Sequence, residues 1–180
     1  MLCLHLDECE MFNDRTQEFI YVKEQDLYLE HSLVSISKWE SKWHKSFLSI
    51  KDKTDEEVID YIRCMTINKN VDPSVYYALS SQQLKKIEEY IEDPYTATTF
   101  VEYQQNMSSR EIITSELIYY WMASYRIPFE CEKWHINRLL ALIRICSIKN
   151  SPDKKMSKAA TMKQNRALNQ ARRQKLKTRG

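Results

Sequence analysis

Apolar and polar residues follow two different periods along this chain, and the period changes near His31. Before His31, residues 18–22 and 26–30 are rich in β-branched and aromatic side chains, which predicts two strands joined by a turn at 23–25. After it, apolar residues recur every three or four positions and form one helical stripe, at Leu33, Ile36, Trp39, Trp43 and Phe47. Because an isolated hairpin is only marginally stable, we expect it to pack on the helices or to add to another chain's sheet.

Polar residues mark the boundaries of the next helices. Thr54 and Glu57 have the spacing of a capping box, in which the first residue is the N-cap and the second lies at the third helical position. The other predicted boundaries lie at serine or next to proline: starts at Asp72-Pro73 and at Ser80 or Ser81, and an end at Asp93-Pro94.

The two most apolar segments lie between residues 108 and 148. One is predicted to begin at Ser108 or Ser109, to run through Trp121 and to end before Pro128, and the other to run from about residue 129 to 148. We interpret them as an antiparallel pair in the core. The expected fold class is mainly α: a compact helical domain with a small N-terminal β-hairpin (about 18–30) and a basic C-terminal arm that is helical or disordered.

The charge of the chain is divided unevenly between its two ends. Residues 151–180 contain ten Lys or Arg and one acid, Asp153, a net charge of about +9. Residues 1–150 contain 17 basic and 24 acidic residues, a net charge of about −7. This predicts an acidic domain over 1–150 and a basic arm over 151–180 that contacts a polyanion, an acidic protein surface or the domain itself.

Composition excludes several classes of protein. The single glycine is Gly180, so a glycine-rich phosphate loop or a nucleophile elbow has no glycine to form it. The five cysteines are scattered, and the apolar run at the N-terminus is too short for a signal peptide. No stretch reaches the roughly 18 apolar residues of a membrane span. Reduced thiols in a cytosol and no membrane partner are therefore expected.

Three groups of residues are of the types found in metal or catalytic sites, but their number or spacing does not fit such a site. Cys3, His5 and Cys9 supply three local ligands where structural zinc takes four. Cys131 and His135 lie four apart without an evident orienting partner, so we expect a structural or interface role, with His135 hydrogen-bonded to neighbouring backbone. The glutamate pairs 56/57, 88/89 and 111/116 lie where solvated charge is expected. We predict no catalytic residue, no metal site and no cofactor, and hence no enzyme.

Two features are candidates for binding a partner. Trp39 and Trp43 lie one helical turn apart with basic residues between them. Tryptophans at this spacing are more often core, and the alternatives are a partner surface or a site for single-stranded nucleic acid. The basic arm is either a solvated tail, a contact to a protein, or a salt-sensitive contact to DNA or RNA. Its candidate residues are Lys154, Lys155, Lys158, Lys163, Arg166, Arg172, Arg173, Lys175, Lys177 and Arg179.

Five segments carry a resemblance that spans nearly the whole chain from about residue 18: Leu29–Trp43, Tyr119–Met122, Ile127–Leu140, Asn165–Arg173 and Thr178–Gly180. They are similar to segments of small proteins from tailed bacteriophages, and the pattern resembles the tail assembly chaperones of siphophages. In such a family the matching segments are packing and interface residues, and no catalytic motif is carried over.

The resemblance implies a non-enzymatic morphogenesis protein that binds the tape-measure protein, keeps it soluble and helps to recruit tail-tube subunits. It would act in the host cytoplasm and be absent from the mature virion. Two alternatives stay open. One is a virion structural or connector protein whose basic arm contacts neighbouring subunits or DNA, and the other is a small nucleic-acid-binding protein. A homo-oligomer is compatible with each.

Overall fold

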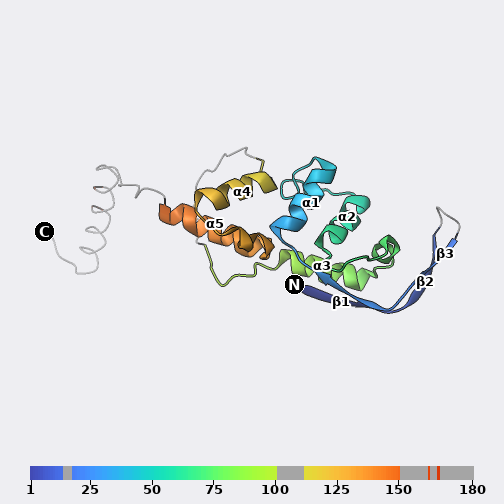
Figure 1. Ribbon diagram of the computed structural model, residues 1–180. Coiled ribbons are helices and arrows are strands. Elements are labelled where there is room, and N and C mark those ends of the chain that lie inside the picture. Colours follow the sequence, from blue (N-terminus) through green and yellow to red (C-terminus); the bar gives the residue numbers. More distant parts are fainter. Residues whose placement is uncertain (14–17, 101–111, 151–161, 163–165, 167–180) are drawn as a thin grey trace, which may run out of the picture. The chain divides into compact units, whose positions relative to one another are not determined.

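The computed structural model describes residues 1–13, 18–100, 112–150, 162 and 166. Contacts divide the chain into two units, Met1–Cys146 and Ser147–Gly180, and the fold described is that of the first. The described part is mainly helical, as predicted (Figure 1). Its elements are β1 (Leu2–Leu6), β2 (Cys9–Asn13), β3 (Glu18–Val22), β4 (Gln25–Leu29), α1 (Leu33–Trp43), α2 (Asp55–Met65), the 3-10 helix η1 (Pro73–Tyr77), α3 (Ser81–Glu92), α4 (Ser115–Ser124), the 3-10 helix η2 (Phe129–Lys133) and α5 (Ile136–Asn150).

The four strands form one long two-stranded ribbon. β1 pairs with β4 and β2 pairs with β3, both antiparallel. The facing pairs Leu6–Gln25 and Cys9–Val22 lie on either side of a two-residue break in each strand, and they belong to the same register. The ribbon is therefore a single antiparallel arrangement that is interrupted at its middle (Figure 1).

The predicted strands exist, but the predicted pairing between them is wrong. Residues 18–22 and 25–29 are both strands, yet each pairs with a strand from the first thirteen residues, and residues 23–24 lie in the break rather than in a turn. The physical reason for the observed pairing is that buried and exposed residues alternate along β1. Leu4 and Leu6 are buried on one face of β1; on this face Leu4 is opposite the buried Leu27 of β4, and Leu2 is opposite the buried Leu29.

The core lies between this apolar face of the ribbon and the helices. The stripe predicted for α1 is confirmed, because Leu33, Ile36 and Trp39 are fully buried. Burial of a leucine or isoleucine side chain contributes about 1.5–3 kcal/mol, so this stripe is a major source of stability. α1 packs against α2, and the Trp39 indole N–H donates a 2.9 Å hydrogen bond to the backbone carbonyl of Glu57.

The predicted helix starts in the first half of the chain are confirmed. The backbone N–H of Glu57 donates to the hydroxyl of Thr54, and the Glu57 carboxylate accepts from the backbone N–H of Thr54, which completes the capping box. Asp72 caps η1 by accepting from the backbone N–H of Ser74, and Ser80 rather than Ser81 caps α3. These starts depend on local hydrogen bonds, which explains why the sequence predicts them well.

The second half differs from its prediction. Helix α4 begins at Ser115, with Thr114 as its N-cap, and residues 112–114 are not helical. The predicted helix start at Ser108 or Ser109 is therefore wrong, and those two serines lie outside the described residues. The predicted helix from about residue 129 is split into η2 and α5. The interruption coincides with a 2.9 Å hydrogen bond from the N–H of Ile136 to the carbonyl of His31.

Helix α4 packs closely on α1. The antiparallel pairing predicted for α4 and α5 stays a prediction, although both helices contribute buried residues to the core: Ile118, Met122, Ile136, Leu139 and Ile143. The buried Glu40 of α1 contributes to the contact between α1 and α4, because its carboxylate accepts the backbone N–H of Ser115 at the start of α4 at 2.7 Å. No helix in the described ranges is long and apolar enough to cross a membrane.

Candidate functional site

A groove of about 300 Å³ opens between α1, α2 and η1. Its walls combine aromatic, aliphatic and charged side chains from these three elements. The lining residues are Lys42, Trp43, Glu56, Ile59, Asp60, Arg63, Pro73, Tyr76 and Tyr77. We call this opening the α1–α2 groove.

Asp60 of α2 holds the two side chains that α1 contributes to the groove, those of Lys42 and Trp43. Its two carboxylate oxygens accept from the Lys42 ammonium at 2.5 Å and from the Trp43 indole N–H at 2.9 Å. The Lys42 ammonium also lies 5.5 Å from the centre of the Trp43 ring, within the range of a cation–π contact. Trp43 is half-buried, and its orientation is set by these contacts.

A buried glutamate of α2, Glu57, pairs with Lys45 in the segment that follows α1. The Glu57 carboxylate accepts from the Lys45 ammonium at 2.6 Å, and Glu57 is almost completely buried. The pKa of Glu57 is lowered, chiefly by the hydrogen bond from Lys45 and then by the bond from the Thr54 backbone. The charged form of Glu57 is therefore favoured, and the Lys45 ammonium that pairs with it lies 5.9 Å from the centre of the Trp43 ring.

Tyr77 of η1 and Arg63 of α2 give the groove an exposed aromatic side chain and a cation. Tyr76 is buried, whereas Tyr77 is 60% exposed. Arg63 is exposed on α2, and no ion pair to it is found within the described ranges. Because Lys42 is neutralised by Asp60, Arg63 supplies a cation beside the exposed aromatic surface. This chemistry suits an apolar side chain that lies next to a carboxylate.

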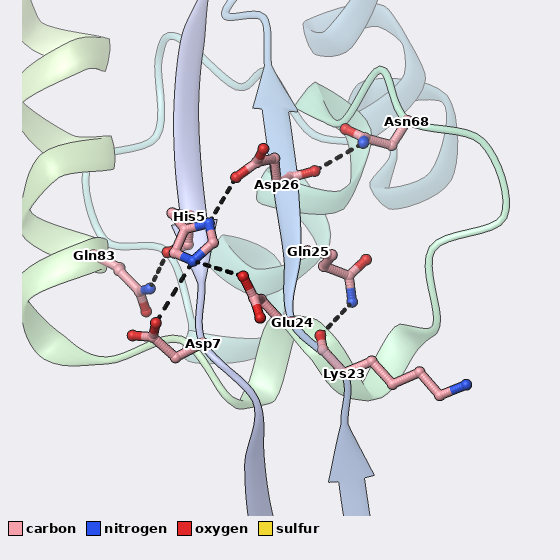
Figure 2. Close-up of polar contacts among 8 residues, drawn as sticks. All are labelled: His5, Asp7, Lys23, Glu24, Gln25, Asp26, Asn68 and Gln83. Carbon is pink, nitrogen blue, oxygen red and sulfur yellow. Dashed lines mark hydrogen bonds and ion pairs between the residues drawn. The ribbon is translucent and has the colours of Figure 1, made fainter.

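A second polar cluster lies at the break of the ribbon (Figure 2). The His5 imidazole contacts Asp26 at 2.8 Å through Nδ1, and Glu24 at 3.5 Å and Asp7 at 3.6 Å through Nε2. The pKa of His5 is raised, first by its hydrogen bond to Asp26 and also by the nearby carboxylates. The Gln83 side chain of α3 donates to the backbone carbonyl of His5 at 2.9 Å, so this cluster ties the ribbon to a helix.

The residues considered as metal ligands or as a nucleophile lie in the ribbon or in the core. No group of three or more potential ligands that could hold a metal occurs among the described residues, and Cys3 and His5 face Tyr28 and Asp26 in the ribbon. Cys131 is buried in the core.

The predicted hydrogen bond of His135 to backbone is confirmed. Its Nε2 atom lies 2.9 Å from the carbonyl oxygen of Tyr90, at the end of α3. Burial lowers the pKa of His135. The imidazole is thus neutral at pH 7 and engaged with the backbone, which is the structural role expected for it.

The predicted partner-binding residues fall into four groups. Trp39 is fully buried and donates to backbone, so it belongs to the core and offers no surface to a partner. Trp43 lines the α1–α2 groove. Arg166 is exposed in a helical turn. The remaining basic residues of the arm lie outside the described residues: Lys154, Lys155, Lys158, Lys163, Arg172, Arg173, Lys175, Lys177 and Arg179.

Sequence reasoning missed most of the groove. Arg63, Tyr76 and Tyr77 belong to two different elements, and no periodic pattern connects them to Trp43. The sequence feature that could have pointed to the groove is the pair of adjacent tyrosines after Pro73, because a short helix that buries one of them leaves the other exposed.

Comparison of the chain with models of protein families, with curated proteins and with solved structures found no match.

Proposed function

We propose that this chain is a non-enzymatic protein of phage tail morphogenesis, a chaperone that binds the tape-measure protein during assembly in the host cytoplasm. The resemblance of the segments Leu29–Trp43 and Ile127–Leu140 to siphophage tail assembly chaperones supports the phage assignment. The observation that carries protein binding is the α1–α2 groove, which places exposed aromatic surface next to a cation.

The groove fits a segment of a helical client. An apolar side chain of the client would lie over Trp43 and Tyr77, and a carboxylate one helical turn away would pair with Arg63. The basic arm over 151–180 would contact further acidic stretches of the client and increase the association rate. The protein would leave the client before the virion is complete.

Co-expression with the tape-measure protein of the same phage, followed by affinity capture, tests this function. We expect the full chain to keep the client soluble and to capture it. Tyr77→Ala removes the exposed aromatic ring, and loss of such an anchor costs about 2 kcal/mol, roughly a 30-fold weaker complex.

The matched control is Tyr120→Ala, because Tyr120 is 64% exposed on α4 and does not line the groove. Equal capture by the wild type and Tyr77→Ala would exclude the groove as the binding site. Failure to capture the client, together with presence of the chain in purified virions, would support a structural connector instead. Removal of 151–180 measures the contribution of the arm separately.

A further inference from the structure

The negative charge of the domain is concentrated in the ribbon. Residues 1–30 contain eight acidic residues and two basic ones, a net charge of about −6. Residues 31–150 contain 16 acidic and 15 basic residues, so the rest of the domain is close to neutral. The net negative charge of residues 1–150 therefore comes almost entirely from the first thirty residues, and a basic partner is attracted chiefly to the ribbon.

The half of the ribbon formed by β2 and β3 has one face open to solvent. Alternate residues of a strand lie on the same face, so Glu10 and Phe12 of β2 share a face with Tyr21 and Phe19, which are opposite them in β3. Phe12 is 44% exposed, Phe19 70% and Tyr21 57%, and Glu10 is exposed as well. Val22, on the other face, is buried. We call the four exposed residues the β2–β3 face.

The β2–β3 face offers aromatic rings and carboxylates together. Phe12 and Phe19 contact each other edge to face, with their ring centres 5.1 Å apart. The Tyr21 hydroxyl donates a 2.5 Å hydrogen bond to the carboxylate of Glu8, which holds this ring at the exposed surface. Neither β2 nor β3 contains a basic residue, and within the described ranges no ion pair to Glu10 is found. Apolar area and negative charge thus lie side by side on this face.

This chemistry selects a cationic side chain with an apolar stem. The face of an aromatic ring attracts an ammonium or guanidinium group, and a nearby carboxylate accepts its hydrogen bonds. Lysine and arginine also bury their methylene stems on apolar surface. Nucleic acid and an anionic membrane would both be repelled by a net charge of about −6, and a purely apolar partner would leave the Glu10 carboxylate desolvated and unpaired.

We propose that the β2–β3 face binds a lysine- or arginine-rich segment of a partner protein. Cationic side chains of the segment lie on the rings of Phe12, Phe19 and Tyr21 and pair with Glu10. The two pairs of facing residues on this face are two positions apart along each strand, about 6.8 Å, which is also the spacing of alternate residues in an extended peptide. An extended segment with a basic residue at every second position therefore fits both pairs. The face shares no residue with the α1–α2 groove, and the proposal does not depend on the client of that groove.

Fluorescence anisotropy of a labelled peptide of alternating arginine and alanine, titrated with the full chain, tests this site. We expect binding that weakens as salt is added, and no binding of the matched peptide of alternating glutamate and alanine. Phe19→Ala, which keeps the net charge, should weaken binding roughly three-fold, and Glu10→Gln should weaken it by a similar factor. The matched controls Tyr120→Ala and Glu88→Gln, at exposed positions on α4 and α3, should bind as the wild type does.

Three results would overturn the proposal. The first is no binding of the arginine peptide even at low salt. The second is binding that Phe19→Ala and Glu10→Gln leave unchanged, which would show attraction to net charge alone. The third is a mass of twice 21.6 kDa in light scattering that Phe19→Ala returns to 21.6 kDa, which would assign the face to a second copy of this chain.

NMR gives an answer that does not depend on any variant. On addition of the arginine peptide, the ring signals of Phe19 and Tyr21 should shift, whereas those of the equally exposed Tyr120 should not. Unchanged signals of Phe19 and Tyr21 at saturating peptide would place the binding elsewhere and contradict the proposal.

Discussion

Acidification should destabilise this protein through a buried histidine that the fold holds neutral. His31 is 2% exposed, and a 2.5 Å hydrogen bond joins its Nδ1 atom to the hydroxyl of Tyr61. Its ring lies edge-to-face against His135, with the ring centres 5.0 Å apart, and the hydroxyl of Tyr90 accepts from its backbone N–H. None of these neighbours is a carboxylate that would stabilise an imidazolium.

The direction and size of the effect follow from the pKa of His31. Burial, followed by repulsion from His135, lowers this pKa from 6.5 to about 3. Between these values the unfolded chain binds a proton that the folded chain does not, so stability is complete above pH 6.5 and is lost as the pH falls. At about 1.4 kcal/mol per pH unit, the loss from this one residue at pH 5.0 is about 2 kcal/mol.

Urea unfolding at pH 7.5 and pH 5.0 measures this loss, with His31→Asn as the test variant. The variant removes the titrating ring and keeps a polar atom near Tyr61, so its free energy of unfolding should depend on pH by about 2 kcal/mol less than that of the wild type. The control is His44→Asn, because His44 is exposed and has a positive φ of 53°, which asparagine tolerates.

Equal pH dependence in the wild type and in His31→Asn would refute this reasoning. An NMR titration of the wild type gives an answer that needs no variant. The ring protons of His31 should keep the chemical shifts of neutral imidazole from pH 7.5 to pH 5.0, and a midpoint near 6.5 would show that the fold does not exclude the imidazolium.

Three further predictions concern single side chains. Glu40→Gln should lower the free energy of unfolding by about 2 kcal/mol in urea denaturation, because the buried carboxylate accepts the backbone N–H of Phe47 at 2.8 Å and that of Ser115 at 2.7 Å; an unchanged midpoint would contradict this role. Thr54→Ala should cost about 1 kcal/mol through loss of the α2 cap, and Thr54→Ser, which keeps the hydroxyl, should restore most of it. The Cys64 thiol has its pKa raised to about 11 by burial, so mass spectrometry should detect slow alkylation by iodoacetamide at pH 8, whereas fast alkylation would show that the thiol is accessible as thiolate.

Strand β1 of the ribbon could also have been predicted from the sequence. The alternation of Leu2, Leu4 and Leu6 with polar residues is typical of a strand with one buried face, and it predicts β1. What the sequence does not contain is the identity of the facing strand. Residues 23–25 looked like a turn because they are polar, but polar residues also occupy a break in a continuous ribbon.

The candidate site was the least predictable feature. Trp43 was identified as a candidate because it repeats at helical spacing with Trp39, but spacing alone does not tell which of the two is buried. The answer depends on α2, whose Glu57 carbonyl accepts the indole N–H of Trp39 and whose Asp60 accepts that of Trp43. Residues far apart in the sequence thus decide which indole faces the groove.

By itself, the sequence determined the mainly helical class, the α1 stripe and the helix starts at Thr54, Asp72 and Ser80, because these depend on contacts within a few residues. Only the tertiary structure decided the strand pairing, the division of the last predicted helix near His135 and the assembly of the groove. Each of these depends on hydrogen bonds and packing between distant segments, whose free energy exceeds the local preferences that a sequence pattern records.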